Sequence, residues 1–186
     1  MTKILYQNIL VFLLYFIFFW FQNLTFFKIQ NSLLPSALIS TASLVFLPHG
    51  IRVLSFVFFG PKVFPGLLIA HIITGFAFNQ VFIEIVVTSL FSTLCVLLAI
   101  KIYTGSFLIR DIKMFDAKFI FIISLIAAII NSLTVNTTWL FLKNDILFSS
   151  LYGLEVFKFI VGDLIGTIIL FYLFIFIRKV IKQSFY

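Results

Sequence analysis

The sequence predicts an all-α, polytopic membrane protein: a bundle of six transmembrane helices with a kinked or broken second helix. Its 186 residues are 63% hydrophobic and only 10% charged, and their mean hydropathy is +1.24. A typical soluble domain is about a quarter charged, so this chain has too few charged side chains to cover a surface that faces water. The high apolar content excludes a soluble enzyme and a disordered tail. The single cysteine excludes a disulfide scaffold.

Six apolar runs predict the six spans, because a spanning helix needs about 20 mostly apolar residues. The runs lie at about 4–27, 36–59, 63–78, 81–103, 117–142 and 152–177. Short polar, charged or Gly-Pro segments separate them, and no linker is long enough for a second domain. We therefore expect one integral membrane domain over residues 1–186.

The distribution of Lys and Arg predicts the orientation. An even number of spans puts both termini on the same side, and cytoplasmic loops are enriched in Lys and Arg. With both termini in the cytoplasm, only Lys28, Lys143 and Lys158 of the 13 basic residues fall in outer segments. We expect a multi-pass protein of the bacterial plasma (inner) membrane, and the net charge of +7 then reflects topology rather than nucleic-acid binding.

The second run contains a break signal. Pro48-His49-Gly50 lies in its middle, where proline removes a backbone donor and glycine adds conformational freedom. This pattern predicts a kink or an unwound turn at these three residues. Because irregular backbone at membrane depth survives only where protein or trapped water satisfies it, the turn should face the bundle interior.

Small residues predict helix–helix contacts. Gly162 and Gly166 in the last run have the small-xxx-small spacing that lets two helix backbones approach closely. Gly66 begins a similar stripe in the third run, and Asn131 lies on a stripe of small and polar residues in the fifth. These stripes predict the interior faces of the bundle.

Asp163 and Arg52 are the ionisable residues that lie deepest in the spans. A charge inside a span costs at least a few kcal/mol, so such residues are functional candidates. Asp163 requires a cation, a hydrogen-bonded polar cavity, or a proton on its carboxyl group. An Arg52–Asp163 pair and a ligand site are about equally well supported, and Arg52 could also extend toward the cytoplasm.

His49 and His71 lie near the predicted midplane on adjacent spans. Two such imidazoles could ligate one b-type haem or sense protons, although hydrogen-bonded interior histidines are the favoured interpretation. Glu84 and Glu155 fall near the outer boundary, where water should reach them, and Lys158 is placed to pair with Glu155.

No catalytic or metal-binding motif stands out. The sequence has no nucleophile elbow, phosphate-binding loop, dinucleotide fingerprint or Cys/His metal spacing. We therefore expect no enzyme activity, no metal and no cofactor, with the haem as the minor alternative.

Two segments resemble a known family. Leu47-Pro48-His49-Gly50-Ile51, then Phe59-Gly60, a basic residue and Phe64-Pro65-Gly66-Leu67, are similar to the signature of bacterial membrane-associated sensor domains of the first type (MASE-like integral membrane sensors). Val161-Gly162-Asp163-Leu164-Ile165-Gly166 resembles that family's Gly-Asp-x-x-Gly on the last helix. The resemblance implies a sensory module, and without an output domain after the last span we expect a stand-alone module that signals through a partner protein.

Three interpretations of function remain. The first is a non-catalytic sensor-like module that responds to an unknown ligand or membrane stimulus. The second is a small-solute transporter or its substrate-binding subunit, and the third is an accessory subunit of a larger membrane complex. The candidate ligand-binding residues are Pro48, His49, Gly50, Arg52, His71, Asn131 and Asp163.

Overall fold

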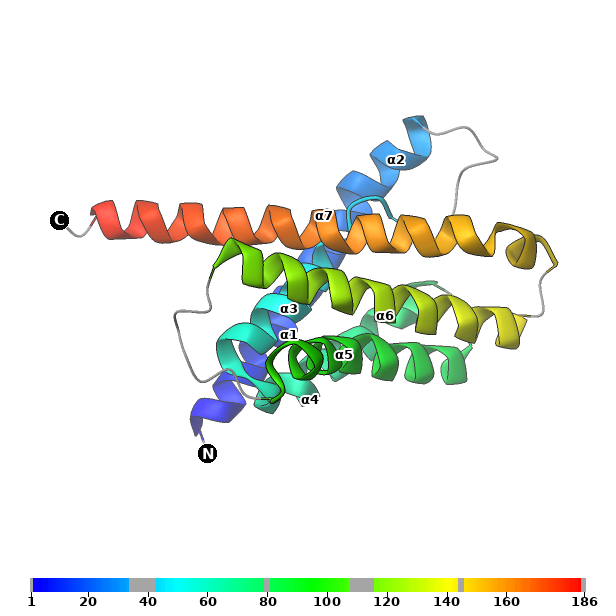
Figure 1. Ribbon diagram of the computed structural model, residues 1–186. Helices are drawn as coiled ribbons and strands as arrows, with labels where there is room; N and C mark the ends of the chain where they lie inside the picture. The colour runs from blue at the N-terminus through cyan, green and yellow to red at the C-terminus, as the bar shows by residue number, and fades with distance from the viewer. Residues whose placement is uncertain (1, 34–42, 79–80, 108–115, 144–145, 185–186) are drawn as a thin grey trace.

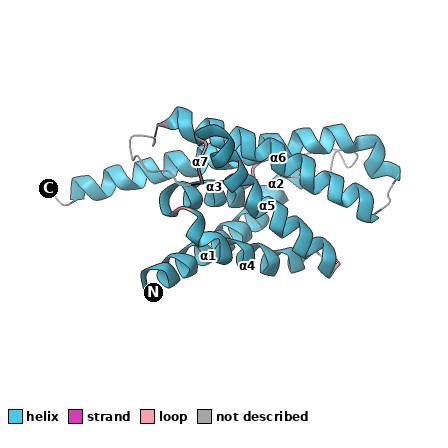
Figure 2. Ribbon diagram, turned by 60° about the horizontal axis from the view of Figure 1, so that its bottom comes forward, coloured by secondary structure: helices cyan, strands magenta, loops and turns pink. Residues whose placement is uncertain are grey.

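A computed structural model describes residues 2–33, 43–78, 81–107, 116–143 and 146–184 of the chain. These residues form helices and short connections, with no strand among them (Figure 2). Four helices are long and apolar enough to cross a membrane and two more are shorter. The predicted class, a helical membrane bundle of about six segments, is confirmed.

The first span is one long helix with a local irregularity. Helix α1 covers Thr2–Gln22, a π-helical segment follows at Asn23–Phe27, and α2 covers Lys28–Leu33. The three pieces form a continuous rod, and α2 extends beyond the rest of the bundle in Figure 1.

The second span is broken, but upstream of the predicted position. Helix α3 covers only Leu47–Phe59, and the described residues before it, 43–46, are not helical. Pro48, His49 and Gly50 form the first turn of α3 rather than an unwound turn. Proline is tolerated there because the first turn of a helix needs no donor from it.

A tight hairpin joins α3 to α4, which covers Phe64–Gly75 between short 3₁₀ turns at Pro61–Val63 and Phe76–Phe78. Gly60 ends α3 with a φ of 73°, a left-handed conformation that favours glycine. With 13 and 12 residues, α3 and α4 each reach about 20 Å or less. Each half of this hairpin is therefore shorter than the ~30 Å hydrocarbon layer.

The last three helices are long. Helix α5 covers Phe82–Thr104, α6 covers Ala117–Lys143 and α7 covers Ile146–Ser184. Helix α7 has 39 residues, more than the predicted sixth span, and its C-terminal part projects past the other helices in Figure 1. Arg178 and Lys179, in this projecting part, are exposed.

Helix α3 lies at the centre of the bundle. It packs against α1 and α7 and also touches α5 and α6, while α5 and α6 pack along each other. Every residue of α3 from Leu47 to Val57 is buried, as expected for a helix surrounded by others. Any polar side chain on α3 must therefore find its partners inside the protein.

Candidate functional site

Helices α3 and α7 meet at glycines. A β-carbon on Gly50 would lie 2.8 Å from the Cα atom of Thr167 on α7. A β-carbon on Gly162 would clash with the Ser43 carbonyl, and one on Gly166 with the Phe46 carbonyl. The backbone N–H of Phe46 donates to the Gly162 carbonyl at 2.9 Å. The start of α3 and the irregular segment before it thus rest directly on the backbone of α7.

Beside this contact lies a cluster of four polar residues from three helices, which we call the Arg52 cluster: His49 and Arg52 of α3, Asn131 of α6 and Asp163 of α7. The exposed fraction of each is 2% or less. His49 Nδ1 lies 3.1 Å from Arg52 Nη2 and 3.1 Å from Asp163 Oδ2. Asn131 Nδ2 donates to the same carboxyl oxygen at 2.8 Å. His49 therefore links the cation to the carboxyl group.

The Nδ1 atom of His49 cannot satisfy both neighbours in the same way. If Nδ1 carries a proton it donates to Asp163, but it then faces an N–H of Arg52. If Nδ1 is unprotonated, its single lone pair accepts from Arg52, the ring proton is on Nε2, and Asp163 Oδ2 keeps the bond from Asn131. The cluster therefore has two hydrogen-bond arrangements that differ by the position of one proton.

Arg52 is held from several sides. Its Nη1 donates to the backbone carbonyl of Ser92 on α5 at 2.5 Å, and its guanidinium lies 5.9 Å from the centre of the Phe46 ring. No part of the residue is exposed, so the alternative in which Arg52 extends to the cytoplasm is wrong. The ring of Phe46 and the carbonyl of Ser92 both stabilise a buried cation.

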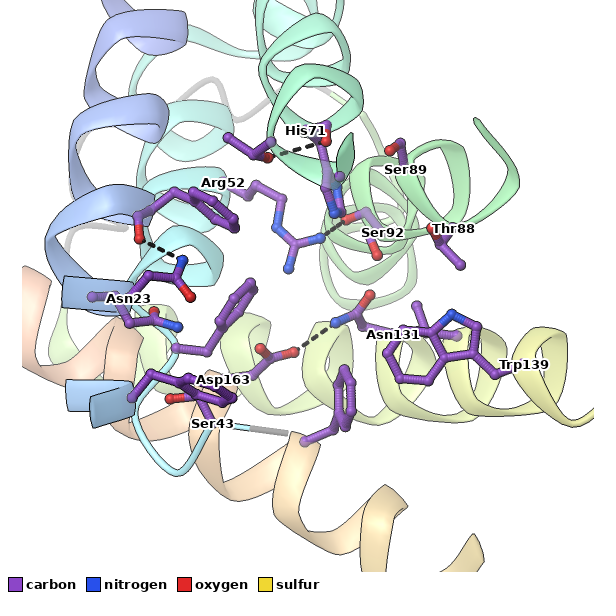
Figure 3. Close-up of a pocket in the computed structure, with 18 residues that line it drawn as sticks. Asn23, Ser43, Arg52, His71, Thr88, Ser89, Ser92, Asn131, Trp139 and Asp163 are labelled. Carbon is purple, nitrogen blue, oxygen red and sulfur yellow. Dashed lines mark hydrogen bonds between the residues drawn. The ribbon is translucent and has the colours of Figure 1, made fainter. Parts of the chain in front are cut away.

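The cluster borders a partly open cavity of about 160 Å³. Arg52, Asn131 and Asp163 point into it from three helices (Figure 3). The rest of the wall combines hydroxyl and amide side chains with aromatic rings. It comprises Phe19, Gln22, Asn23, Phe27, Ser43, Phe46, His71, Thr74, Gly75, Thr88, Ser89, Ser92, Val135, Trp139 and Phe159.

Several polar atoms of the wall have no hydrogen-bond partner within the described protein. They include Arg52 Nε, Asn131 Oδ1, Asp163 Oδ1 and Ser89 Oγ. A buried polar group without a partner costs about 1–3 kcal/mol. A cavity with this many unused donors and acceptors can bind a molecule that supplies the missing partners.

The predicted site residues divide into two groups. Arg52, His71, Asn131 and Asp163 line the cavity, whereas Pro48, His49 and Gly50 do not. Pro48 is in the first turn of α3 and Gly50 packs against α7. His49 lies outside the cavity wall and contacts two of its residues, Arg52 and Asp163. Arg52 and Asp163 form no direct ion pair within the described chain, because each contacts His49 instead.

His71 is separate from the Arg52 cluster. Its ring packs 5.6 Å from the ring of Tyr15, and its Nδ1 has no hydrogen-bond partner in the described residues. The described part of the chain contains no group of three or more His, Cys, Asp or Glu side chains that could hold a metal ion. Haem ligation by His49 and His71 stays a prediction.

The two glutamates near the predicted outer boundary are less accessible than expected. Glu84 is 6% exposed and Glu155 is 4% exposed, because neighbouring helices cover them. The predicted pair with Lys158 is confirmed, with Lys158 Nζ donating to Glu155 Oε1 at 3.1 Å.

Sequence reasoning missed several residues of the site. Gln22 accepts a hydrogen bond from the backbone N–H of Leu47 at 2.8 Å and so caps α3. Ser89 and Ser92 bring α5 to the cavity. The only signal for Gln22 is that it is a polar residue in an apolar run, and Ser92 contributes through its backbone carbonyl, which no sequence pattern reveals.

The chain was compared with protein-family models, with curated proteins and with solved structures, and none of them matches it. The chemistry of the site itself is therefore the basis for assigning a function.

Proposed function

We propose that the protein is a non-catalytic, sensor-like module of the bacterial plasma membrane, with both termini in the cytoplasm. A small ligand binds in the cavity beside the Arg52 cluster and changes the packing of α3 against α7. A partner protein in the membrane or the cytoplasm reads this change. The enrichment of Lys and Arg in the termini and in every second connection supports this orientation, because cytoplasmic segments of membrane proteins are rich in these residues.

One observation carries this proposal: the two-way contact of His49 Nδ1 at the edge of a cavity with unpaired polar atoms. A ligand that bonds to Arg52 or Asp163 favours one of the two hydrogen-bond arrangements over the other. Differential binding to two states is sufficient to shift a conformational equilibrium. The close glycine contact of α3 with α7 couples the cluster to the helix packing.

The continuity of α7 supports a signalling role. Asp163 and both packing glycines lie on the helix that continues without interruption to Ser184, about 30 Å farther along at 1.5 Å per residue. Its exposed part carries apolar residues such as Phe176 and Ile177 together with Arg178 and Lys179. A partner that contacts this part of α7 would detect a movement that begins at Asp163.

Electron spin resonance can test the coupling. In a Cys95→Ser background, spin labels at Lys101→Cys on α5 and Lys179→Cys on α7 report the distance between exposed sites on the two helices. We expect Asp163→Asn to shift this distance by about 1–2 Å or more in lipid nanodiscs. Labels at Lys101→Cys and Lys118→Cys, on the packed pair α5 and α6, are the control and should not move. Identical α5–α7 distances in the parent and the variant would contradict the sensor proposal.

A transporter is the second candidate, because the broken span borders a polar cavity, as in many carriers. Carriers expose their site alternately to both sides. A Ser89→Cys variant in the Cys95→Ser background distinguishes the transporter from the sensor. The variant is treated in oriented vesicles with a thiol reagent that does not cross the membrane. Labelling from both sides supports a transporter, and labelling from one side or neither supports the sensor.

A further inference from the structure

The chemistry of the cavity wall restricts the ligand that it can bind, given the ligand-binding role proposed above. Three residues of the wall carry a polar atom that has no partner among the described residues: the donor Arg52 Nε and the acceptors Asp163 Oδ1 and Asn131 Oδ1. All three belong to residues that are at least nine-tenths buried. Figure 3 shows Arg52 directed into the space from one side and Asp163 with Asn131 from the other. A ligand that satisfies them needs an acceptor at one end and an N–H donor at the other.

The charges of the site favour a ligand with no net charge. Arg52 supplies a cation and Asp163 a carboxyl group, and both contact the same His49 nitrogen. With Asp163 ionised, Arg52 and Asp163 balance each other, and an added anion or cation would have no counter-charge in an apolar interior, which is unfavourable. A zwitterion would have to give up the hydration of two full charges, whereas an amide gives up much less.

The size and the aromatic walls favour a flat ring. The volume of about 160 Å³ is close to that of engineered cavities that hold one benzene molecule. Phe46, Trp139 and Phe159 supply aromatic surface around the polar atoms. Aromatic side chains contact planar molecules well, in stacked or edge-on geometry.

We propose that the cavity binds a small, uncharged, planar ring that carries an N–H group on one edge and a carbonyl on the opposite edge, as uracil does with its N1–H and C4 carbonyl. The N–H donates to Asp163 Oδ1 or Asn131 Oδ1, and the carbonyl accepts from Arg52 Nε. The ring packs between the aromatic side chains. This arrangement uses the unpaired donor and at least one of the unpaired acceptors of the Arg52 cluster.

Isothermal calorimetry on the full chain in nanodiscs tests this proposal with uracil as the probe. We expect saturable binding of uracil below about 10 mM. Its 1,3-dimethyl derivative lacks both N–H donors and should bind at least tenfold more weakly. Benzoate, methylammonium and glycine represent an anion, a cation and a zwitterion, and should not bind in the same range.

A matched pair of variants locates the binding. Asn131 lines the cavity, whereas Asn136, on the same helix and equally buried, bonds to the Ser132 carbonyl of its own helix. Asn131→Ala should weaken uracil binding at least tenfold, and Asn136→Ala should leave it within twofold. If either variant fails to fold, the comparison of uracil with its dimethyl derivative still decides.

Three results would overturn the assignment: no uracil binding, equal binding of the dimethyl derivative, or tighter binding of any charged or zwitterionic probe. The spin-label distance between α5 and α7, measured with and without uracil, separates this proposal from the proposed function. Binding without a shift in distance supports the ligand class and contradicts the sensor. A shift with glycine or benzoate but not with uracil supports the sensor and overturns the ligand class.

Discussion

Two asparagines join helices in this protein, and they use their hydrogen-bonding groups differently. Asn8 on α1 donates to the carbonyls of Ile4 and Lys62 and accepts from the backbone N–H of Gly66 at 2.7 Å. Asn131 on α6 donates to Asp163, and its carbonyl oxygen has no partner in the described chain. Both the side-chain nitrogen and the side-chain oxygen of Asn8 have hydrogen-bond partners. The side-chain oxygen of Asn131 has none among the described residues.

A glycine packs closely on another backbone segment near each of these asparagine contacts. Gly66 meets the backbone of Asn8, and Gly162 meets the backbone of Ser43. Similar packing therefore surrounds a satisfied polar group in one region and an unsatisfied one in the other. The α1–α4 contact thus uses its polar groups within the protein, while the α3–α6–α7 contact has polar atoms without partners among the described residues, as the proposed ligand site requires.

Removing one charge from the Arg52 cluster should have the largest effect. Arg52→Gln or Asp163→Asn alone leaves a buried charge without its counter-charge and should cost about 3–5 kcal/mol of unfolding free energy. The double variant removes both charges and should be more stable than either single variant. Denaturant unfolding in detergent measures all three, and additive losses would show that the two residues are not coupled.

Adding a methyl group to the glycine contacts should destabilise both regions. A β-carbon at Gly66 would lie 2.5 Å from the Asn8 carbonyl oxygen, so Gly66→Ala and Gly162→Ala should each cost about 3 kcal/mol. Gly153 has no atom within 4 Å of a built β-carbon, and Gly153→Ala is the control, with an expected gain of about 0.5–1 kcal/mol. Thermal unfolding of the three variants checks this. A Gly162→Ala protein as stable as Gly153→Ala would mean that α7 does not pack closely on residues 43–46.

The two asparagines themselves can be exchanged for alanine. Asn8→Ala loses three hydrogen bonds and leaves the Gly66 N–H without an acceptor, so we expect a loss of about 2 kcal/mol. Asn131→Ala loses one hydrogen bond but also removes an unpaired carbonyl, so its expected loss is about 1 kcal/mol. Chemical unfolding under identical conditions gives the difference. A larger loss for Asn131→Ala than for Asn8→Ala would reverse the assignment of structural and binding roles.

The smallest effect is expected at the cap of α3. Gln22→Ala removes the acceptor for the Leu47 N–H, and the loss of a helix cap costs about 1 kcal/mol. Gln7→Ala, on the same helix, is the control, because the side-chain oxygen of Gln7 has no partner among the described residues. A difference in thermal stability between the two variants measures the cap, and no difference would show that α3 does not depend on it.

The sequence predicted the membrane class, the approximate spans and the interior position of Asp163, because long apolar runs and rare charges are local signals. It also placed Asn131 on an interior face of the bundle through the stripe of small and polar residues. The position of the break was predicted wrongly: Pro48 and Gly50 are typical of a kink, yet residues 43–46 form the irregular segment and contain neither residue type. Which face of each helix turns inward depends on contacts between distant segments.

For the same reason the central position of His49 was not predicted. Two histidines near the midplane could be recognised from spacing alone. That His49 lies between Arg52 and Asp163, while His71 packs against Tyr15, depends on the rotation of α3 and α4 about their axes. Periodicity within one helix does not determine this rotation.

The π-helical segment at Asn23–Phe27 has a consequence for the register of the first span. Such segments arise from one inserted residue in an α-helix, and each residue turns an α-helix by about 100°. Beyond the insertion, Gln30 accepts a hydrogen bond from the Leu44 N–H at 2.7 Å. Deleting a single residue from 23–27 would give a regular helix, but it would rotate Gln30 away from Leu44 and detach the chain entering α3 from the end of the first span.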